Sequence, residues 1–107
     1  MHKVTISQGT GVVRNLNYAD ARKLAFYDAV SNIIERAVET ITPMENKVKN
    51  YLLLKEHIYP RALEYINRYK YISEKWDKRY YKVIIQAHID LESLKKDLIK
   101  IGIATKR

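Results

Sequence analysis

The segment YINRYKYISEKWDKRYYKVIIQAHID, residues 65–90, contains two runs rich in tyrosine and β-branched residues that flank a charged turn, Asp77-Lys78-Arg79. This pattern predicts a β-hairpin. Because side chains alternate between the two faces of a strand, the second run should bury one face and expose the other. The expected core face comprises Tyr81, Val83, Ile85, Ala87 and Ile89. The expected outer face, which is basic and aromatic, comprises Tyr80, Lys82, Gln86 and His88, with Ile84 as the exception to the pattern.

The chain before the hairpin begins with a predicted strand over Lys3–Ser7. Gly9 and Gly11 follow it, and their small size permits a bulge or a turn. A long amphipathic helix should then run from Tyr18 to about Ile41 with Asn17 as its N-cap, because apolar residues recur there at helical spacing. The expected buried stripe is Phe26, Ala29, Val30, Ile33, Ile34, Ala37 and Ile41, and Asp28, Asn32, Glu35 and Glu39 should face away.

Two further helices are predicted. One spans Asn46–Tyr59 and has a wide apolar surface that needs burial. Pro60 ends it, so residues 61–65 should form a separate turn that leads into the hairpin. The last helix follows Asp90, which can cap it, and stops at Gly102.

The resulting order is β-α-α-β-β-α, which predicts one α+β domain over residues 1–107. Two layers are expected, in which a small, mostly antiparallel three-stranded sheet packs one face against the helices. The first strand could lie beside either strand of the hairpin. At an edge of the sheet it would leave that edge open to a partner.

The composition narrows the classes of function. The formal net charge is +8, which favours anionic partners such as nucleic acid, acidic protein, anionic lipid or cell-wall polymer. The chain has no cysteine, which excludes disulfides, thiolate catalysis and cysteine-ligated metal sites. No apolar run approaches the roughly 20 residues of a membrane span, and no signal peptide is visible.

Four segments carry a resemblance to a known family: VTISQGTGVV, ADARKLAFYDAVSNIIERAVETI, NYLLLKEHIYPRALEYINRYKYISE and YYKVIIQAHIDLESLKKDLIKIGI. In this order, over nearly the entire chain, they resemble the N-terminal domain of flagellar assembly protein T and related small periplasmic or lipoprotein modules. The most telling residues are Gly9, Gly11, Ala21, Ala25, Asp28, Ala29, Tyr65, Ile66, Tyr69, Ser73, Glu74, Leu91, Leu94, Leu98 and Gly102.

The resemblance implies a non-enzymatic binding or assembly module of the bacterial cell envelope. In flagellate bacteria such a module helps to build a ring around the motor at the outer membrane. The expected partners are other envelope or flagellar proteins and a second copy of the chain. The expected location is periplasmic or outer-membrane-associated, with the export signal or lipid anchor removed, or cytoplasmic if Met1 is the true start.

No pattern of residues indicates an enzyme, a metal site or a cofactor. His2, His57 and His88 lie far apart in different predicted elements and form no ligand motif. Ser73 beside Glu74 and Ser93 near Asp90 are explained by turn, cap and edge roles. We therefore expect no catalytic residues, no cofactor and no metal.

The candidate binding surface is the basic and aromatic part of the hairpin: Arg68, Lys70, Trp76, Lys78, Arg79, Tyr80 and Lys82. Docking of an acidic protein is one hypothesis for it. Nucleic-acid binding is the alternative, because bases stack on exposed rings while cations contact phosphates. The chain lacks the signature run of RNA-recognition sheets. Trp76 could also serve only to close the hairpin against the helices.

Overall fold

The computed structural model describes residues 2–103 and 105, without the side chains at positions 2, 44, 46 and 47. It has the predicted α+β fold and element order. The elements are β1 (His2–Val12), α1 (Tyr18–Ile41), α2 (Met44–Lys49), α3 (Tyr51–His57), the 3₁₀ helix η1 (Tyr59–Tyr65), β2 (Ile66–Trp76), β3 (Tyr80–Asp90) and α4 (Leu91–Lys100).

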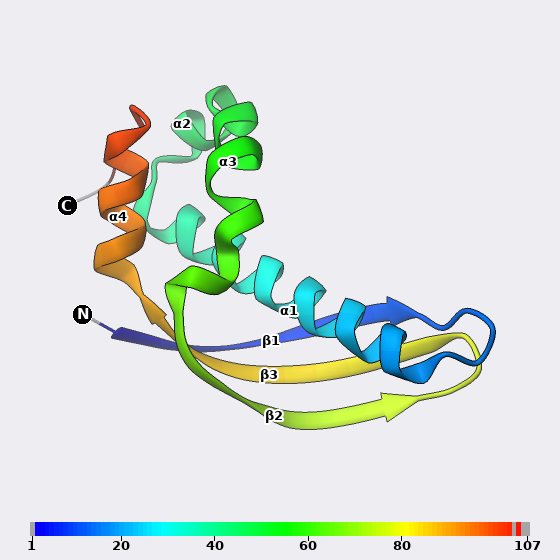
Figure 1. Ribbon diagram of the computed structural model, residues 1–107. Coiled ribbons are helices and arrows are strands. Elements are labelled where there is room, and N and C mark those ends of the chain that lie inside the picture. Colours follow the sequence, from blue (N-terminus) through cyan, green and yellow to red (C-terminus); the bar gives the residue numbers. More distant parts are fainter. Residues whose placement is uncertain (1, 104, 106–107) are drawn as a thin grey trace.

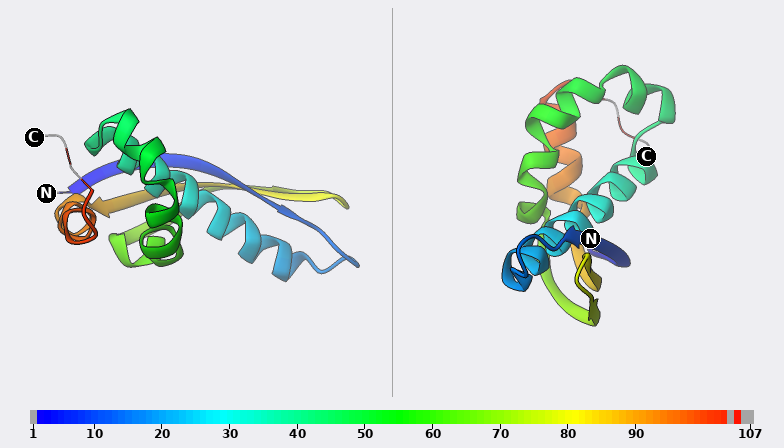
Figure 2. Two further views of the ribbon diagram at one scale, coloured as in Figure 1. Left: turned by 90° about the horizontal axis from the view of Figure 1, so that it is seen from above. Right: turned by 90° about the vertical axis from the view of Figure 1, so that its right-hand side faces the viewer.

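The three strands form one antiparallel sheet in the order β1-β3-β2, so the first strand lies beside the second strand of the hairpin. The hairpin itself has the predicted strands and turn. In Figure 1, α1 runs along the sheet, whereas α2, α3 and α4 gather at the end opposite the hairpin turn. The two views in Figure 2 show that the helices lie on one side of the sheet, so its other face is not covered by them.

The hydrophobic core lies between α1 and the central strand β3. All seven residues of the predicted stripe of α1 are buried. On the sheet, the five predicted core residues of β3 are also buried and alternate with less buried ones. Each large aliphatic side chain buried in this way contributes about 1.5–3 kcal/mol, which makes this layer the main source of stability.

The prediction of a bulge or turn at Gly9 and Gly11 is wrong. The strand β1 continues through both glycines to Val12 and pairs with β3 along its whole length. The physical reason for the glycines is close packing. A Cβ atom on Gly9 would lie 2.0 Å from the carbonyl oxygen of Ala25, and one on Gly11 would lie 2.1 Å from that of Ala21. The two glycines therefore allow the backbone of α1 to approach the strand.

The predicted helix over Asn46–Tyr59 is divided in the structure. It forms α2 and α3, which meet at Asn50, a residue with low helix propensity. Its apolar surface is only partly buried, because Leu54 and Ile58 enter the core. Val48, Tyr51 and Leu52 stay more than half exposed, contrary to the expectation that this whole surface needs burial.

The end of the chain follows the predicted capping pattern. The Asp90 side chain accepts a hydrogen bond from the N–H of Ser93 at 3.1 Å and from its hydroxyl at 2.8 Å. At the other end of α4, Gly102 has φ +90°, and the N–H of Ile103 donates to the Leu98 carbonyl. Together with the hydrogen bond from the Gly102 N–H to the Ile99 carbonyl, this bond forms a Schellman motif, which satisfies carbonyl groups at the helix end.

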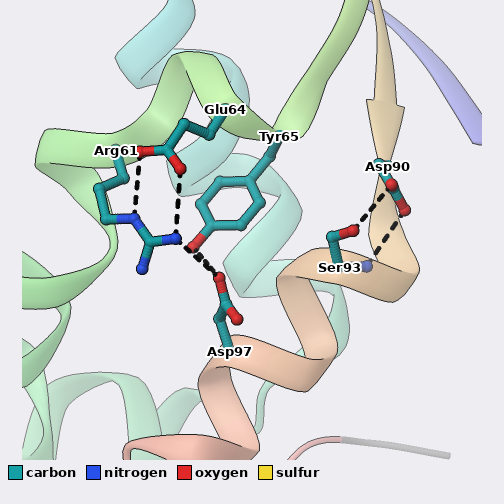
Figure 3. A network of polar contacts seen from close by, with 6 residues as sticks. All are labelled: Arg61, Glu64, Tyr65, Asp90, Ser93 and Asp97. Atoms are coloured by element: carbon teal, nitrogen blue, oxygen red, sulfur yellow. Dashed lines mark hydrogen bonds and ion pairs between the residues drawn. The ribbon is translucent and has the colours of Figure 1, made fainter.

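A polar network joins η1 to α4 (Figure 3). The Tyr65 hydroxyl donates to Asp97 Oδ2 at 2.7 Å, and Arg61 lies 3.5 Å from the same oxygen atom. Arg61 also donates to both carboxylate oxygens of Glu64. The Tyr65 side chain is otherwise buried, and this burial together with its bond to Asp97 raises the pKa of Tyr65. The network thus positions the segment that precedes β2.

Candidate functional site

The face of the sheet opposite the helices is the candidate site, and we call it the open face. Residues paired directly across strands share a face, so the register defines it. One row runs Val4, His88 and Arg68, and the next runs Ile6, Gln86 and Lys70. The complete set is Val4, Ile6, Gln8, Thr10 and Val12 of β1, Tyr80, Lys82, Ile84, Gln86 and His88 of β3, and Arg68, Lys70, Ser73 and Lys75 of β2.

Positive charge gathers on the β2 side of the open face. Arg68, Lys70, Lys75 and Lys82 are all exposed, and none of the open-face residues defined above carries a carboxylate. Two wide depressions lie between these side chains. One of about 380 Å³ is lined by residues that include Arg68, Lys70 and His88. The other, of about 310 Å³, is lined by residues that include Lys75 and Lys82. Such a surface attracts anionic groups.

The β1 side of the open face is mainly apolar, with Gln8 and Thr10 as its polar residues. Val4 and Ile6 are each 52% exposed, and Val12 is 47% exposed. They alternate along β1 with residues that face the helices, of which Ser7 and Gly9 are buried. The open face therefore consists of an apolar stripe beside a cationic stripe, with the mixed residues of β3 between them.

The structure brings together four of the seven predicted site residues. Arg68, Lys70, Tyr80 and Lys82 share the open face. Lys78 and Arg79 occupy the hairpin turn beside Tyr80. Trp76 does not join them, because it pairs with the core residue Tyr81 and stacks on its ring at 5.3 Å with an interplanar angle of 10°. The Trp76 side chain is nevertheless 59% exposed on the helix side of the sheet.

Asp77 fixes the hairpin turn that carries Lys78 and Arg79. Its Oδ1 accepts hydrogen bonds from the N–H of Arg79 at 2.7 Å and from that of Tyr80 at 2.8 Å. These two backbone donors lower the pKa of the Asp77 carboxyl, with the Tyr80 N–H as the larger cause. The two turn cations are therefore presented at a defined position at the end of the open face.

The tyrosines between the cations of β2 face the helices. The Tyr69 ring lies 4.8 Å from that of Phe26, and Tyr71 stacks on the same phenylalanine. The Arg22 guanidinium lies 4.2 Å from the centre of the Tyr71 ring. The sequence correctly indicates the alternation of cations and rings. It does not indicate that the alternation leaves Tyr80 as the one aromatic residue of the open face as defined above.

Glu74, the acidic residue of β2, is paired on the helix side. Arg22 Nε lies 2.6 Å from Glu74 Oε1, and the Tyr81 hydroxyl donates to the same oxygen at 2.8 Å. The bond from Arg22, followed by that from Tyr81, lowers the pKa of Glu74. The negative charge of this strand is thus held away from the open face.

The contacts that a group of polar residues on α1 makes with β1 were not predicted from the sequence. Asp28 and Asn32 were expected to face away, yet they and Arg36 bond to the edge strand β1. The N–H of Thr10 donates to Asp28, Asn32 donates to the carbonyl of Gln8, and Arg36 donates to the carbonyl of Ile6. The signal in the sequence was a row of polar residues at intervals of four positions beside the apolar stripe.

The described part of the chain offers no group of three or more potential metal ligands among His, Asp and Glu residues. Of the three histidines, His57 and His88 lie in separate elements, and the side chain of His2 is outside the described structure. Ser93 and Asp90 form a helix cap, whereas Ser73 and Glu74 point to opposite faces of β2. Within residues 2–103, no helix combines the length and apolar character needed to span a membrane.

Comparison of the chain with protein-family models, with curated proteins and with solved structures gave no match in any of the three cases.

Proposed function

We propose that this chain is a non-enzymatic binding module that docks an acidic protein surface on the open face of its sheet. The observation that carries the proposal is the composition of that face, where exposed cations lie beside half-exposed apolar residues. Protein interfaces combine apolar contact with charge complementarity. A partner with acidic and apolar residues side by side fits both stripes.

The resemblance to the N-terminal domain of flagellar assembly protein T suggests where such a module works. We extend the proposal to a periplasmic or outer-membrane-associated component that docks on other envelope proteins, including those of a flagellar basal-body ring. Copies of the chain in a ring would associate head to tail, because only a contact between two different surfaces, with the right rotation, closes a ring. The open face would supply one of these two surfaces.

Nucleic-acid binding is the second candidate, and the cations of the open face and the turn favour it. Base stacking is the weak point of this candidate. Tyr69 and Tyr71 pack against Phe26 on the helix side, so they offer no stacking platform beside the cations. The apolar side chains of β1 have no role in contacts with phosphates. Both observations favour a protein partner.

Cross-linking in living cells tests the proposal. A photoreactive amino acid is placed at Gln86, in the middle of the open face, and in a matched variant at Lys23, an exposed position on α1. We expect Gln86 to cross-link to an acidic protein in the envelope fraction and Lys23 to give no such adduct. Nucleic-acid adducts from Gln86, or the same protein adducts from both positions, would overturn protein docking on this face. A cytoplasmic location would overturn the envelope assignment.

A further inference from the structure

The two edges of the sheet differ in how the fold protects them. At the outer edge of β1, backbone groups of three alternate residues already bond to α1 side chains. The N–H of Thr10 donates to Asp28 at 2.8 Å, and the carbonyls of Gln8 and Ile6 accept from Asn32 and Arg36 at 3.0 and 3.2 Å. An additional strand would have to break these bonds. The edge of β1 is therefore closed to strand addition, contrary to the expectation that it would be open.

The opposite edge of the sheet is the outer side of β2. Figure 1 shows β2 as the outermost strand, with no helix along its outer side. For residues 68–76, the described structure gives the backbone no hydrogen bond to a neighbouring element other than the ladder with β3. Arg68, Tyr69 and Lys70 are exposed, and Ile72 is 48% exposed. An unpaired strand edge of this kind is a template for β-strand addition.

The side chains of β2 indicate which strand would fit. On the open face, Arg68, Lys70 and Lys75 project beside the position that a new strand would take. On the helix side, Tyr69 is 48% exposed and continues the aromatic contact with Phe26. Because side chains of a strand alternate between its faces, a segment with acidic residues at every second position and apolar residues between them would satisfy both sides.

A second copy of β2 fits this edge poorly. Antiparallel pairing of two β2 strands would place the cations of one copy beside those of the other on the same face, and like charges on neighbouring strands are destabilising. Charge complementarity therefore selects a different, acidic partner.

We propose that the outer edge of β2 binds an extended acidic segment of a partner protein by strand addition. The segment alternates acidic with apolar residues, and its backbone completes the ladder along residues 68–76. This inference rests on the proposed function, because the cations that would select the segment belong to the open face. It adds recognition through backbone hydrogen bonds. Strand addition can therefore be disproved without disproving docking on the open face.

Amide hydrogen exchange measured by NMR tests the proposal. The probe is a capped peptide with alternating glutamate and valine, as long as the segment Arg68–Trp76. The matched control peptide has the same composition with all glutamates in one block and all valines in the other. We expect the alternating peptide to slow exchange of alternate amides within residues 68–76 by about tenfold or more and to leave the amides of β1 unchanged. The blocked peptide should have no such effect.

Each other outcome identifies which idea fails. Binding of the alternating peptide without protection in β2 would overturn strand addition and leave docking on the open face intact. The absence of binding would also overturn strand addition, and the cross-linking from Gln86 would then decide the proposed function separately. Protection of β2 that rises with protein concentration in the absence of peptide would show that a second copy is the occupant.

A substitution at Ile72 gives an independent check. Ile72 lies at a register shift between Tyr71 and Ser73, so it has no direct partner in β3. Proline is tolerated at such bulges of edge strands but removes a backbone donor. We expect Ile72→Pro to fold and to lose peptide binding, and Ile72→Ala to retain it. Equal binding by the two folded variants would contradict the proposal. If Ile72→Pro does not fold, the hydrogen-exchange experiment on the unaltered chain is the test of strand addition.

Discussion

At the scale of single residues, Gly9 and Gly11 determine how closely α1 approaches the sheet. The atoms that a Cβ on either glycine would meet are helix backbone atoms and, for Gly9, also the Cβ of Ala29, and none of these can rotate away as a longer side chain can. The sequence shows two glycines in a strand-like stretch, and a bulge or turn was a reasonable prediction from that pattern. The distinction between a turn and a close approach depends on contacts with helix residues ten or more positions away in the sequence, which local rules do not include.

The first prediction concerns Gly9. The substitution Gly9→Ala places a Cβ 2.0 Å from the Ala25 carbonyl oxygen, so the strand and the helix must separate. We expect a loss of about 3 kcal/mol in the free energy of unfolding, at the upper end of the usual cost of overpacking. Urea denaturation measures it. The control Thr10→Ala changes the neighbouring residue on the open face and should cost no more than about 0.5 kcal/mol. A Gly9→Ala variant as stable as this control would contradict the packing account.

The second prediction concerns Glu74 and pH. The folded chain lowers the pKa of this carboxyl below 4.5 through its bonds with Arg22 and Tyr81. A carboxyl with a lower pKa in the folded state contributes stability above its unfolded pKa, and this contribution is lost as the pH falls through the folded pKa. Glu74→Gln should therefore be less stable than the unaltered chain near neutral pH, by about 0.5–1 kcal/mol for a partly exposed ion pair.

The same variant should lose this disadvantage in acid. We expect the stability difference between Glu74→Gln and the unaltered chain to shrink as the pH falls below 4.5. Denaturation curves at a series of pH values measure it, with Glu35→Gln on the exposed face of α1 as the control. A difference that is the same in acid as at neutral pH would show that the charge of Glu74 has no part in folding.

At the scale of elements, the apolar patterns of α1 and β3 predicted which of their residues form the core. The long helix, its N-cap at Asn17, the hairpin turn and the stop at Gly102 all follow from local capping and turn rules and are confirmed. The division of the second helix at Asn50 was missed because its apolar residues continue across the break. The contacts of α1 with the edge of β1 were missed because polar residues on a helix are usually solvated.

The third prediction concerns these edge contacts. Asp28→Ala removes the acceptor for the N–H of Thr10, so this amide should exchange faster with solvent. The expected cost in stability is about 1 kcal/mol, the net contribution of an ordinary hydrogen bond. Lys23→Ala, another exposed position on α1, is the matched control. Unchanged exchange at Thr10 in Asp28→Ala would indicate that Asp28 does not protect this edge.

At the scale of the whole molecule, the fold class and the sheet with one uncovered face could be predicted from the sequence. The strand order could not, because hydrophobic alternation does not say which neighbour a strand pairs with. The candidate surface was predicted in part. Alternation separates Arg68 and Lys70 from Tyr69 and Tyr71. The register shift between Tyr71 and Ser73, which alternation does not predict, moves Trp76 to the helix side. The apolar stripe of β1 belongs to the candidate surface because β1 pairs with β3, and this pairing could not be predicted from the sequence.

The fourth prediction concerns where anionic partners bind. A protein with net charge +8 attracts polyanions weakly over its whole surface, so the location of binding must be separated from total charge. Two variants do this. One changes Arg68, Lys70, Lys75 and Lys82 of the open face to Gln. The other changes Lys23, Lys55, Lys96 and Lys100, which are exposed on the helices, to Gln. Each variant loses four positive charges.

The most direct measurement is the affinity of these two variants and the unaltered chain for a random copolymer of glutamate and tyrosine, which carries both acidic and apolar groups. We predict that the open-face variant loses at least about tenfold in affinity, because several charge pairs of about 0.2–1 kcal/mol each are removed together. The helix variant should bind nearly as well as the unaltered chain. Equal losses in the two variants would mean that binding follows net charge alone, and would contradict the claim that the open face is the docking surface.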